Sequence, residues 1–296
     1  MTDTIHHWHI AGLGAIGSLC NATALMSATK VTPIVREGSH NYCTHFVDLS
    51  GNTLELTSPV TLTDVDTIER LVVPLKSYDV LPYLSQVKSK LTNTAQVVLC
   101  HNGMGTIEPA LEILPSTVNL YFCTSSHGVY KQDRQAKYAG LGESSWQLIH
   151  KGNADELSNE EVNAILPRAR RSTNLNLLLW QKLIINCAIN PLTAIHKVKN
   201  GKLAAEQFQP LITAVVEEAV DVAKANDVEI NVNNMLDKVN QVIHLTGANT
   251  SSMLQDVLNN RPTEIDFITG YLINQAQKLG FNLPKNQELY KAIKSL

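Results

Sequence analysis

Short apolar runs alternate with helical stretches through the first half of the chain. Residues 16–28 and 78–91 have apolar side chains at helical spacing, and they lie between runs of β-type residues. The runs that predict strands are 8–12, 31–36, 70–76, 95–100 and 118–124. Strand, helix and strand in succession predict a parallel sheet with crossover helices.

The pattern changes in the second half of the chain. Residues 125–150 are rich in Gly, Ser and aromatic residues, and they predict antiparallel strands at the sheet edge. Residues 158–171 are predicted to be helical, and nearly everything after 177 has the spacing of long amphipathic helices. We therefore predict an α/β, Rossmann-type parallel-sheet domain over 1–172 and an all-α domain over 173–296.

Composition narrows the class of protein. The 296 residues are 44% hydrophobic and carry a net charge of -3, which leaves no general basic surface for nucleic acid or an anionic membrane. The five cysteines show no close pairing and suit reduced thiols in a cytosol. The N-terminus lacks a signal-peptide pattern, and no apolar run approaches the roughly 18 residues that span a bilayer. We expect a soluble, cytoplasmic protein.

A glycine motif follows the first predicted strand and opens the first helix. Gly12, Gly14 and Gly17 are spaced as G-x-G-x-x-G. In that context the motif predicts a dinucleotide site, because glycines permit a tight turn and let a pyrophosphate lie on the helix N-terminus. A tight turn without a ligand is the alternative. The candidate cofactor contacts in the motif are Gly12, Leu13, Gly14, Ala15, Ile16 and Gly17.

The end of the second predicted strand indicates which dinucleotide binds. NAD sites usually have an acidic residue there, which accepts a hydrogen bond from the ribose 2′-OH. This chain has Arg36, followed by Glu37. A guanidinium suits a 2′-phosphate, and neighbouring side chains on an extended segment alternate, so we expect Glu37 to point elsewhere. The prediction is NADPH/NADP+ rather than NAD.

Two further loops follow predicted strands, where open parallel sheets bind ligands. Lys76 ends one strand, and Asn102 lies in a Gly-flanked turn after another. Lys76 is alternatively a solvated lysine, and Asn102 is alternatively a turn residue before Gly103. Both remain candidate ligand contacts.

The helical half contains a polar stripe of Lys182, Asn186 and Asn190 within an otherwise apolar helix. Positions four apart share one helix face, so the three side chains face either water or a pocket. Farther on, Glu264 lies where a new helix can begin, and a role in capping is the alternative to a functional one. The histidines lack the paired spacing of a metal site, so no metal is predicted.

Five stretches in this order closely resemble the ketopantoate reductase family, and the resemblance covers essentially the whole chain: "GLGAIG", "HNGMGTIE", "WQKLIINCAINPLTAI", "NGKL" and "TSSMLQDVLNNRPTEIDFITG". The resemblance implies reduction of 2-dehydropantoate (ketopantoate) to (R)-pantoate with NADPH, in pantothenate and coenzyme A synthesis. It also implies a Rossmann domain and a helical domain with the active site in the cleft between them.

The same resemblance implies roles for individual residues. Lys182 is the implied proton donor, and Glu264 is the glutamate of the last motif, with a catalytic and cofactor-binding role. The implied substrate contacts are Asn102, Lys182, Asn186, Asn190, Asn200 and Ser252. The implied cofactor contacts outside the glycine motif are Arg36, Lys76, Asn102, Val129 and Glu264. Two departures are Leu178, where the family often has an acid, and residues 125–150, which match only loosely around Val129.

The chemistry of these residue types agrees with that assignment. Hydride delivered to a ketone leaves negative charge on oxygen, so a donor must supply a proton there. Asparagines bind hydroxyl and carboxylate oxygens without adding charge. Two other functions remain open: an NADP-dependent reductase of another small 2-oxo acid, and a non-enzymatic NADP(H) sensor. The joint presence of Lys182 and Glu264 counts against the sensor. Ketopantoate is the expected partner, and monomer and homodimer are both compatible with the sequence.

Overall fold

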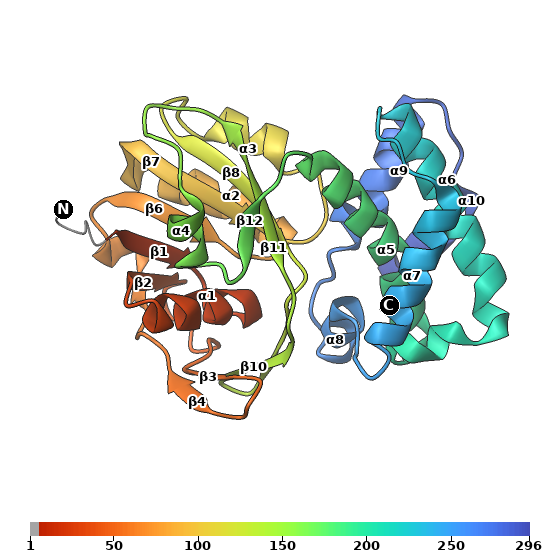
Figure 1. The fold of residues 1–296 in the computed structure, drawn as a ribbon, viewed down its shortest axis with the longest axis horizontal. Coiled ribbons are helices and arrows are strands. Elements are labelled where there is room, and N and C mark those ends of the chain that lie inside the picture. The colour runs from red at the N-terminus through yellow and green to blue at the C-terminus, as the bar shows by residue number, and fades with distance from the viewer. Residues whose placement is uncertain (1–5) are drawn as a thin grey trace. The chain divides into compact units, whose positions relative to one another are not determined.

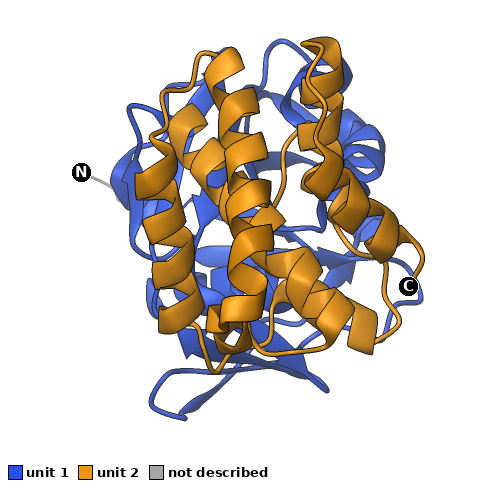
Figure 2. Cartoon of the chain, turned by 90° about the vertical axis from the view of Figure 1, so that its right-hand side faces the viewer, with its two compact units in different colours: residues 1–101, 106–175 blue, residues 102–105, 176–296 orange. Residues whose placement is uncertain are grey.

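The computed structural model describes residues 6–296 and contains two compact units, which are coloured separately in Figure 2. Unit 1 comprises the described residues up to His101, together with Thr106–Leu175. Unit 2 comprises Asn176–Leu296 and a short loop, Asn102–Gly105, that leaves the sheet of unit 1. Each unit has its own hydrophobic core.

A large sheet forms the centre of unit 1 (Figure 1). Its eight strands follow the order β12-β11-β8-β7-β6-β1-β2-β5. Their bounds are β1 His7–Ala11, β2 Lys30–Val35, β5 Val60–Thr61, β6 Ile68–Val73, β7 Leu91–Cys100, β8 Asn119–Ser125, β11 Ser144–His150 and β12 Ala169–Arg171. The pairings among β1, β2, β5, β6, β7 and β8 are all parallel. The predicted parallel α/β sheet is therefore confirmed.

Continuous apolar runs make up the central strands because helices cover the sheet. Residues 95–100 of β7 and 119–124 of β8 are buried at every position. The helices of unit 1 are α1 Ala15–Met26, η1 Leu62–Asp64, α2 Ser77–Val87, η2 Lys88–Lys90, α3 Ile107–Ile113 and α4 Asn159–Asn163. Helices α1 and α2 agree with the predicted helical stretches.

A second, smaller sheet belongs to unit 1 and has the order β4-β3-β10-β9. Its strands are β3 His45–Val47, β4 Thr53–Glu55, β9 Gly128–Gln132 and β10 Gln135–Gly140. Helix α1 lies between the two sheets (Figure 1): Cys20 packs into the core of the large sheet, whereas Leu19 and Ala22 pack against Phe46 of the small one. This position explains why residues 17–24 are buried without interruption.

Two predictions at the end of unit 1 need correction. Of the strands expected within 125–150, β11 does pair antiparallel with β8, but β9 and β10 join the small sheet instead. The helix predicted over 158–171 ends at Asn163, and residues 169–171 form β12. Pro167 cannot donate a helical hydrogen bond, and Arg168 has a left-handed backbone with φ of 51°. The chain therefore turns and pairs with β11.

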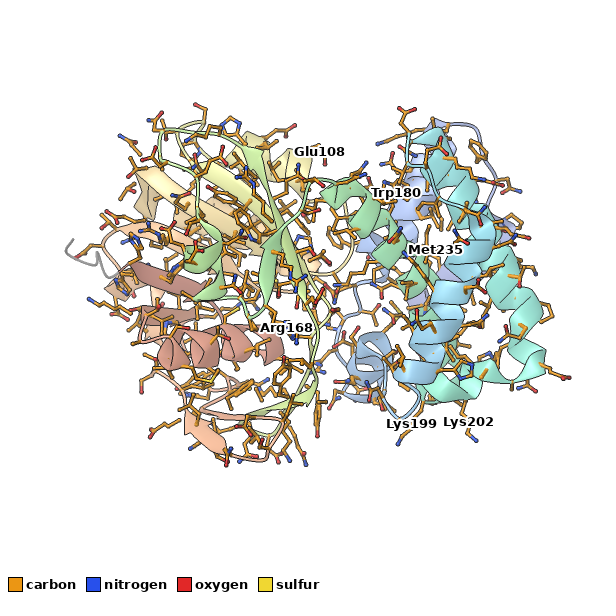
Figure 3. The ribbon with its side chains drawn as sticks, viewed as in Figure 1. Glu108, Arg168, Trp180, Lys199, Lys202 and Met235 are labelled. Carbon is orange, nitrogen blue, oxygen red and sulfur yellow. The ribbon has the colours of Figure 1, made fainter. Side chains whose placement is uncertain are left out.

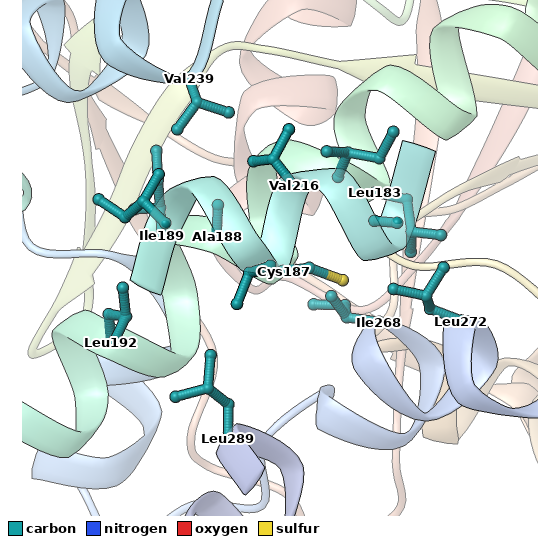
Figure 4. Packing of buried hydrophobic residues seen from close by; sticks show 14 of the residues in the cluster. Leu183, Cys187, Ala188, Ile189, Leu192, Val216, Val239, Ile268, Leu272 and Leu289 are labelled. Atoms are coloured by element: carbon teal, nitrogen blue, oxygen red, sulfur yellow. The ribbon is translucent and has the colours of Figure 1, made fainter. Parts of the chain in front are cut away.

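Unit 2 is helical throughout, as predicted for this half of the chain. Its elements are α5 Leu175–His196, η3 Asn200–Ala204, η4 Glu206–Phe208, α6 Gln209–Ala225, α7 Val232–Leu245, α8 Ser252–Leu258, η5 Ile265–Phe267, α9 Thr269–Lys278 and α10 Pro284–Lys294. Trp180 of α5 and Met235 of α7 are both buried in this unit (Figure 3). Figure 4 shows the packing at its centre, where Cys187 and Ala188 of α5 lie among side chains of the surrounding helices.

Helix α5 corrects the expectation that no apolar segment is long enough to span a bilayer. Its 22 residues are long and apolar enough to cross a membrane by length and composition. However, 67% of its most apolar stretch is buried inside the protein. Pro191 lies inside the helix without ending it. Helix α5 is thus the core helix of unit 2, and its apolar character follows from that burial.

The five cysteines are all free and buried, which leads to the first prediction. Burial raises the pKa of the Cys187 thiol to about 12 and also raises the pKa of Cys20 and of Cys43, so little thiolate forms at these positions. We expect a chromogenic disulfide reagent at about pH 8 to react slowly with the folded protein and with five thiols after unfolding in denaturant. Rapid, stoichiometric labelling of one thiol in the folded protein would contradict this burial.

Candidate functional site

The glycine loop lies where the strand order of the large sheet reverses. β1 is flanked by β2 on one side and by β6 on the other. Open α/β sheets bind ligands at such a point, outside the carboxyl ends of the strands. Gly12–Gly17 follows β1, Arg36 follows β2 and Lys76 comes shortly after β6. The structure therefore brings these predicted cofactor contacts of unit 1 to one edge of the sheet.

The backbone of the loop depends on two of its glycines. Gly12 has φ of +82°, a left-handed conformation that favours glycine. Its N–H donates to the carbonyl oxygen of Ile34 at 2.7 Å, which ties the turn to β2. At Gly17 a Cβ would collide with the carbonyl oxygen of Gly12. Gly12 and Gly17 are thus required by the turn itself, whether or not a ligand binds.

Gly14 differs from both, because no packing contact explains it. It is exposed, has an ordinary φ of -78°, and has no heavy atom within 4 Å of the place where a Cβ would stand. Helix α1 begins at the next residue and has no side-chain cap, so its first N–H groups remain available to an anion. Open space above unsatisfied N–H groups fits the pyrophosphate of a dinucleotide.

The other residues of the loop contribute through the backbone. Leu13 is buried in the core, and Ile16 packs against the core of the large sheet. Ala15 is partly buried at the first position of α1. Their side chains therefore serve packing, and their peptide groups are the atoms suited to a phosphate.

Arg36 and Lys76 lie on the two sides of this loop. The side chain of Arg36 is 77% exposed, and its Nη2 donates to Oδ1 of Asp79 at 2.5 Å. Asp79 lies in the first turn of α2, the helix whose N-cap residue is Lys76. Lys76 is partly buried. Two cationic residues thus lie at this edge of the sheet, and Arg36 forms an ion pair with an acidic neighbour.

Val129 and His127 lie in and next to β9, near the small sheet. The side chain of Val129 packs against the small core under that sheet. His127 is buried, and its Nδ1 accepts from the N–H of Gly142 at 3.0 Å, so Nε2 carries the hydrogen and donates to the carbonyl oxygen of Pro167 at 3.0 Å. Burial lowers the pKa of His127, which keeps it neutral. These contacts give His127 a structural role at this turn.

In unit 2 the predicted polar stripe lies on α5. Lys182 and Asn186 are partly buried, and Asn190 is 7% exposed. The intervening residues Leu183, Cys187 and other apolar side chains of α5 are in the core of the unit. The stripe therefore occupies one face of a helix whose opposite face is fully packed, which fixes the direction of its side chains.

Thr193 continues the stripe and connects it to α8. Its hydroxyl is buried, donates to backbone carbonyls of α5, and lies 2.7 Å from the hydroxyl of Ser251. Ser251 in turn accepts from the N–H of Leu254 at 3.1 Å as the N-cap of α8. The predicted residue Ser252 is the first residue of this helix and is exposed. A pair of hydroxyls thus sets the position of Ser252 relative to the stripe.

Asn200 opens η3 and has an unusual buried atom. The residue is 7% exposed, and its Nδ2 donates to the hydroxyl of Thr246 at 2.9 Å. Its N–H donates to the carbonyl oxygen of Asn249 at 3.1 Å. Its Oδ1 is buried and has no hydrogen-bond partner within the protein. An unmet acceptor of this kind is costly unless a ligand or water satisfies it.

Glu264 and Asn102 belong to the same unit. Glu264 is 4% exposed, precedes η5 and forms no side-chain cap with it, which weakens the helix-capping alternative. The loop with Asn102 packs on η5, because the N–H of Met104 donates to the carbonyl oxygen of Phe267 at 2.8 Å. A Cβ at Gly103 would collide with that same oxygen. The loop after β7 is therefore part of the surroundings of η5.

Several residues of the site were not predicted. Asp256 of α8, which lies in the last of the five motifs and was given no role there, is 2% exposed and pairs with Nε of Arg261 at 3.3 Å. Thr193 continues the helical spacing of the stripe by about one turn, and that spacing could have indicated it. Ser251 lies in the same motif as a polar candidate, whereas Asp79 gave no signal, because its partner Arg36 is 43 positions away. Among the described residues, no group of three or more His, Cys, Asp or Glu side chains could hold a metal ion.

Comparison with known families gives two matches that together cover most of the chain. The profile of "Ketopantoate reductase PanE/ApbA" matches residues 8–150, and that of "Ketopantoate reductase PanE/ApbA C terminal" matches residues 174–296. The first contains the glycine loop and Arg36, and the second contains the polar stripe.

Individual proteins give the same family. The chain is 37% identical over 228 residues to the 2-dehydropantoate 2-reductase of Vibrio cholerae, covering 76% of this chain and 77% of that protein. It is 30% identical over 294 residues to the enzyme of the same name from Escherichia coli O157:H7, covering 96% and 93%.

Solved structures agree in fold. A ternary structure of D-mandelate dehydrogenase with NADH and anilino(oxo)acetate superposes with a TM-score of 0.89 at 22% identity, covering 98% of both chains. A PanE/ApbA family ketopantoate reductase from Ralstonia eutropha superposes with a TM-score of 0.86 at 21% identity, covering 98% of this chain and 97% of that one.

The contrast between Gly14 and Gly17 gives the second prediction. Gly14→Val should still fold, because its side chain meets open space and the loss of a glycine N-cap costs only about 1 kcal/mol, but it should lose binding of the dinucleotide. Gly17→Val should instead lower the thermal unfolding midpoint, because its side chain meets backbone. Calorimetry with NADPH and thermal unfolding measure the two effects. Unchanged affinity in folded Gly14→Val protein would refute the phosphate-loop assignment.

Proposed function

This chain belongs to the ketopantoate reductase PanE/ApbA family, and we propose that it reduces 2-dehydropantoate to (R)-pantoate with NADPH. The observation that carries the proposal is the combination of two features within one chain. One is an open, uncapped glycine loop at a sheet reversal, and the other is an amphipathic core helix with one polar face that contains Lys182.

The cofactor half of the proposal rests on unit 1. The glycine loop would hold the pyrophosphate on the N–H groups at the start of α1, as the space above Gly14 permits. The guanidinium of Arg36 would bind the 2′-phosphate with charge-assisted hydrogen bonds. Lys76 would add a second positive charge on the other side of the loop. The bound nicotinamide supplies a hydride to the substrate.

The proton-transfer half rests on unit 2. Reduction of the keto group creates negative charge on its oxygen, and we assign Lys182 to donate a proton there. The partly buried position of Lys182 on a packed helix suits this role, because the helix backbone and the apolar face behind it hold the side chain in one direction. A donor that is positioned before the reaction loses little entropy during it.

The remaining polar residues would orient the substrate. Asn186 and Asn190 follow Lys182 on the same face, and their amides can bind the carboxylate and hydroxyl oxygens of ketopantoate without adding net charge. Asn200 would contribute from the start of η3, where its amide already bonds the hydroxyl of Thr246. Ser252 would add a hydroxyl at the start of α8, and buried Glu264 and Asn102 would contact substrate or cofactor from η5 and the neighbouring loop.

The choice of 2-oxo acid is the part of the proposal that activity tests most directly. The superposition on D-mandelate dehydrogenase is at 22% identity, so it supports the fold and leaves the substrate to the pocket residues. Following NADPH absorbance with ketopantoate and with a panel of other 2-oxo acids, including an aryl one, compares their kcat/KM values. The proposal requires ketopantoate to be the best substrate. A higher kcat/KM for another acid would assign that acid instead, and no turnover with any of them would favour a sensor.

The third prediction concerns cofactor choice. Arg36→Ala should raise the KM for NADPH by about ten- to a hundredfold, the usual worth of a charge-assisted contact to phosphate. The KM for NADH should change little, because that cofactor lacks the 2′-phosphate. Initial rates with both cofactors measure the effect. Equal effects of Arg36→Ala on the KM for NADPH and on the KM for NADH would contradict the assignment of Arg36.

The fourth prediction concerns the proton donor. Lys182→Ala should lower kcat by about a hundredfold or more, which is typical for loss of a positioned general acid. NADPH affinity should change little, because the glycine loop and Arg36 belong to unit 1. Lys224→Ala is the matched control: it removes an exposed lysine from α6 of the same unit and should leave kcat unchanged.

Two further substitutions test whether the polar stripe of α5 lines a substrate pocket or faces solvent. Asn186→Ala and Asn190→Ala should act chiefly on the KM for ketopantoate, because they orient substrate without exchanging its proton. If the stripe simply faced water, Lys182→Ala and both asparagine variants would keep near-normal turnover. Exposed polar residues rarely contribute more than about 0.5 kcal/mol. A folded Lys182→Ala protein that retains most of its ketopantoate reductase activity would contradict the proposed mechanism.

A further inference from the structure

One ion pair lies across the edge that carries the glycine loop. Nη2 of Arg36 donates to Oδ1 of Asp79 at 2.5 Å, although the two residues are 43 positions apart. Arg36 follows β2, and Asp79 lies in the first turn of α2, which follows β6. Because β1 lies between β2 and β6, the ion pair joins the elements on both sides of the strand that carries the loop. Two interstrand spacings, about 10 Å, separate those elements.

The two partners are held differently. The side chain of Arg36 is 77% exposed and that of Asp79 is 31% exposed. Asp79 is fixed in helix α2, where its N–H donates to the carbonyl oxygen of Lys76 at 2.8 Å and where the helix dipole favours an acidic side chain. Arg36 follows the end of a strand and is the more exposed partner. The carboxylate therefore stays at this edge, whichever ligand Arg36 contacts.

We propose that Asp79 sets how strongly the protein distinguishes NADPH from NADH, and that its charge narrows the preference that Arg36 creates. The proposal rests on the proposed function, in which Arg36 binds the 2′-phosphate. A 2′-phosphate must displace Asp79 from the guanidinium or share the guanidinium with it. In both cases the carboxylate repels the phosphate, so Asp79 weakens binding of NADPH.

The same carboxylate does not oppose NADH. The ribose of NADH has a 2′-hydroxyl, which carries no charge and can donate a hydrogen bond to an acidic side chain. Arg36 thus favours NADPH over NADH, and Asp79 reduces that preference. A carboxylate that merely orients Arg36 would have the contrary effect, because pre-organisation of the guanidinium would help the phosphate bind. Replacement of Asp79 separates the two possibilities by the sign of the change.

The test measures binding of two nucleotides that differ only in the 2′-phosphate. Adenosine 2′,5′-bisphosphate and adenosine 5′-monophosphate are titrated into the full-length protein by calorimetry. Asp79→Asn, which keeps the shape and removes the charge, should tighten the bisphosphate about three- to tenfold, within the range of exposed charge pairs. It should leave the Kd of the monophosphate within about twofold. The gain should decrease in high salt, because screening weakens the repulsion.

Three companion variants complete the experiment. Asp79→Glu keeps the charge and should bind both nucleotides as the unaltered protein does. Asp66→Asn is the matched control: it removes the same charge from an exposed residue that precedes β6, at the opposite end of that strand, and should change neither Kd. In an Arg36→Ala background the gain from Asp79→Asn should shrink, since part of it acts through the guanidinium. Thermal unfolding confirms that each variant is folded.

The outcomes separate this proposal from the proposed function. Weaker or unchanged binding of the bisphosphate in folded Asp79→Asn protein overturns the role of Asp79, whatever the cofactor preference of the unaltered protein. Equal binding of both nucleotides by the unaltered protein overturns the NADPH preference alone. If Asp79→Asn then creates a preference for the bisphosphate, the role of Asp79 stands.

Discussion

The close packing of Gly17 on the carbonyl of Gly12 is the constraint on which unit 1 depends. Because Gly17 has no Cβ, α1 can begin directly after the turn and pass close to the end of β1. The turn is fixed from the other side by the hydrogen bond from Gly12 to Ile34 of β2. With both ends of the loop fixed, Gly14 is left exposed above the unsatisfied N–H groups of α1. The open space at the start of α1 is thus a consequence of how a helix packs against a strand.

The burial of α1 between two sheets extends this constraint. Cys20 contacts the core of the large sheet, and Leu19 contacts the core of the small one. A helix held on two faces cannot rotate to follow a ligand, so its N-terminus is positioned by the fold. Unit 2 uses the same device on α5, where a packed face containing Cys187 fixes the direction of the polar face. In both units a candidate contact group is oriented by apolar packing behind it.

Local periodicity could predict most of the fold, and it failed where a distant partner decides the conformation. The central strands and α1, α2 and α5 are long, apolar and regular, so the sequence contains their signal. Residues 169–171 look helical in isolation. They form β12 because β11 offers a partner and because the side chain of Asn163 bonds the N–H and carbonyl of Ala169 at 2.8 and 2.7 Å. No spacing rule contains that information.

The candidate site also combines residues that local patterns predict with contacts between residues distant in sequence. Glycine spacing, the position of Arg36 and the spacing of Lys182, Asn186 and Asn190 are local patterns, and each could be predicted from the sequence. The contact between Thr193 and Ser251 joins positions 58 apart, and that between Arg36 and Asp79 joins positions 43 apart. Such pairs appear only once the chain is folded.

Pairs that form only on folding also change the electrostatic potential. The potential at any site is a sum over all charges that the fold brings there. A guanidinium after β2 gives the sign of the attraction, but the first turn of α2 contributes an opposite charge at hydrogen-bonding distance. The electrostatic potential at this edge is therefore set by elements on both sides of β1. A rule that considers only the end of one strand identifies Arg36 as a candidate phosphate contact and leaves out the carboxylate that pairs with it.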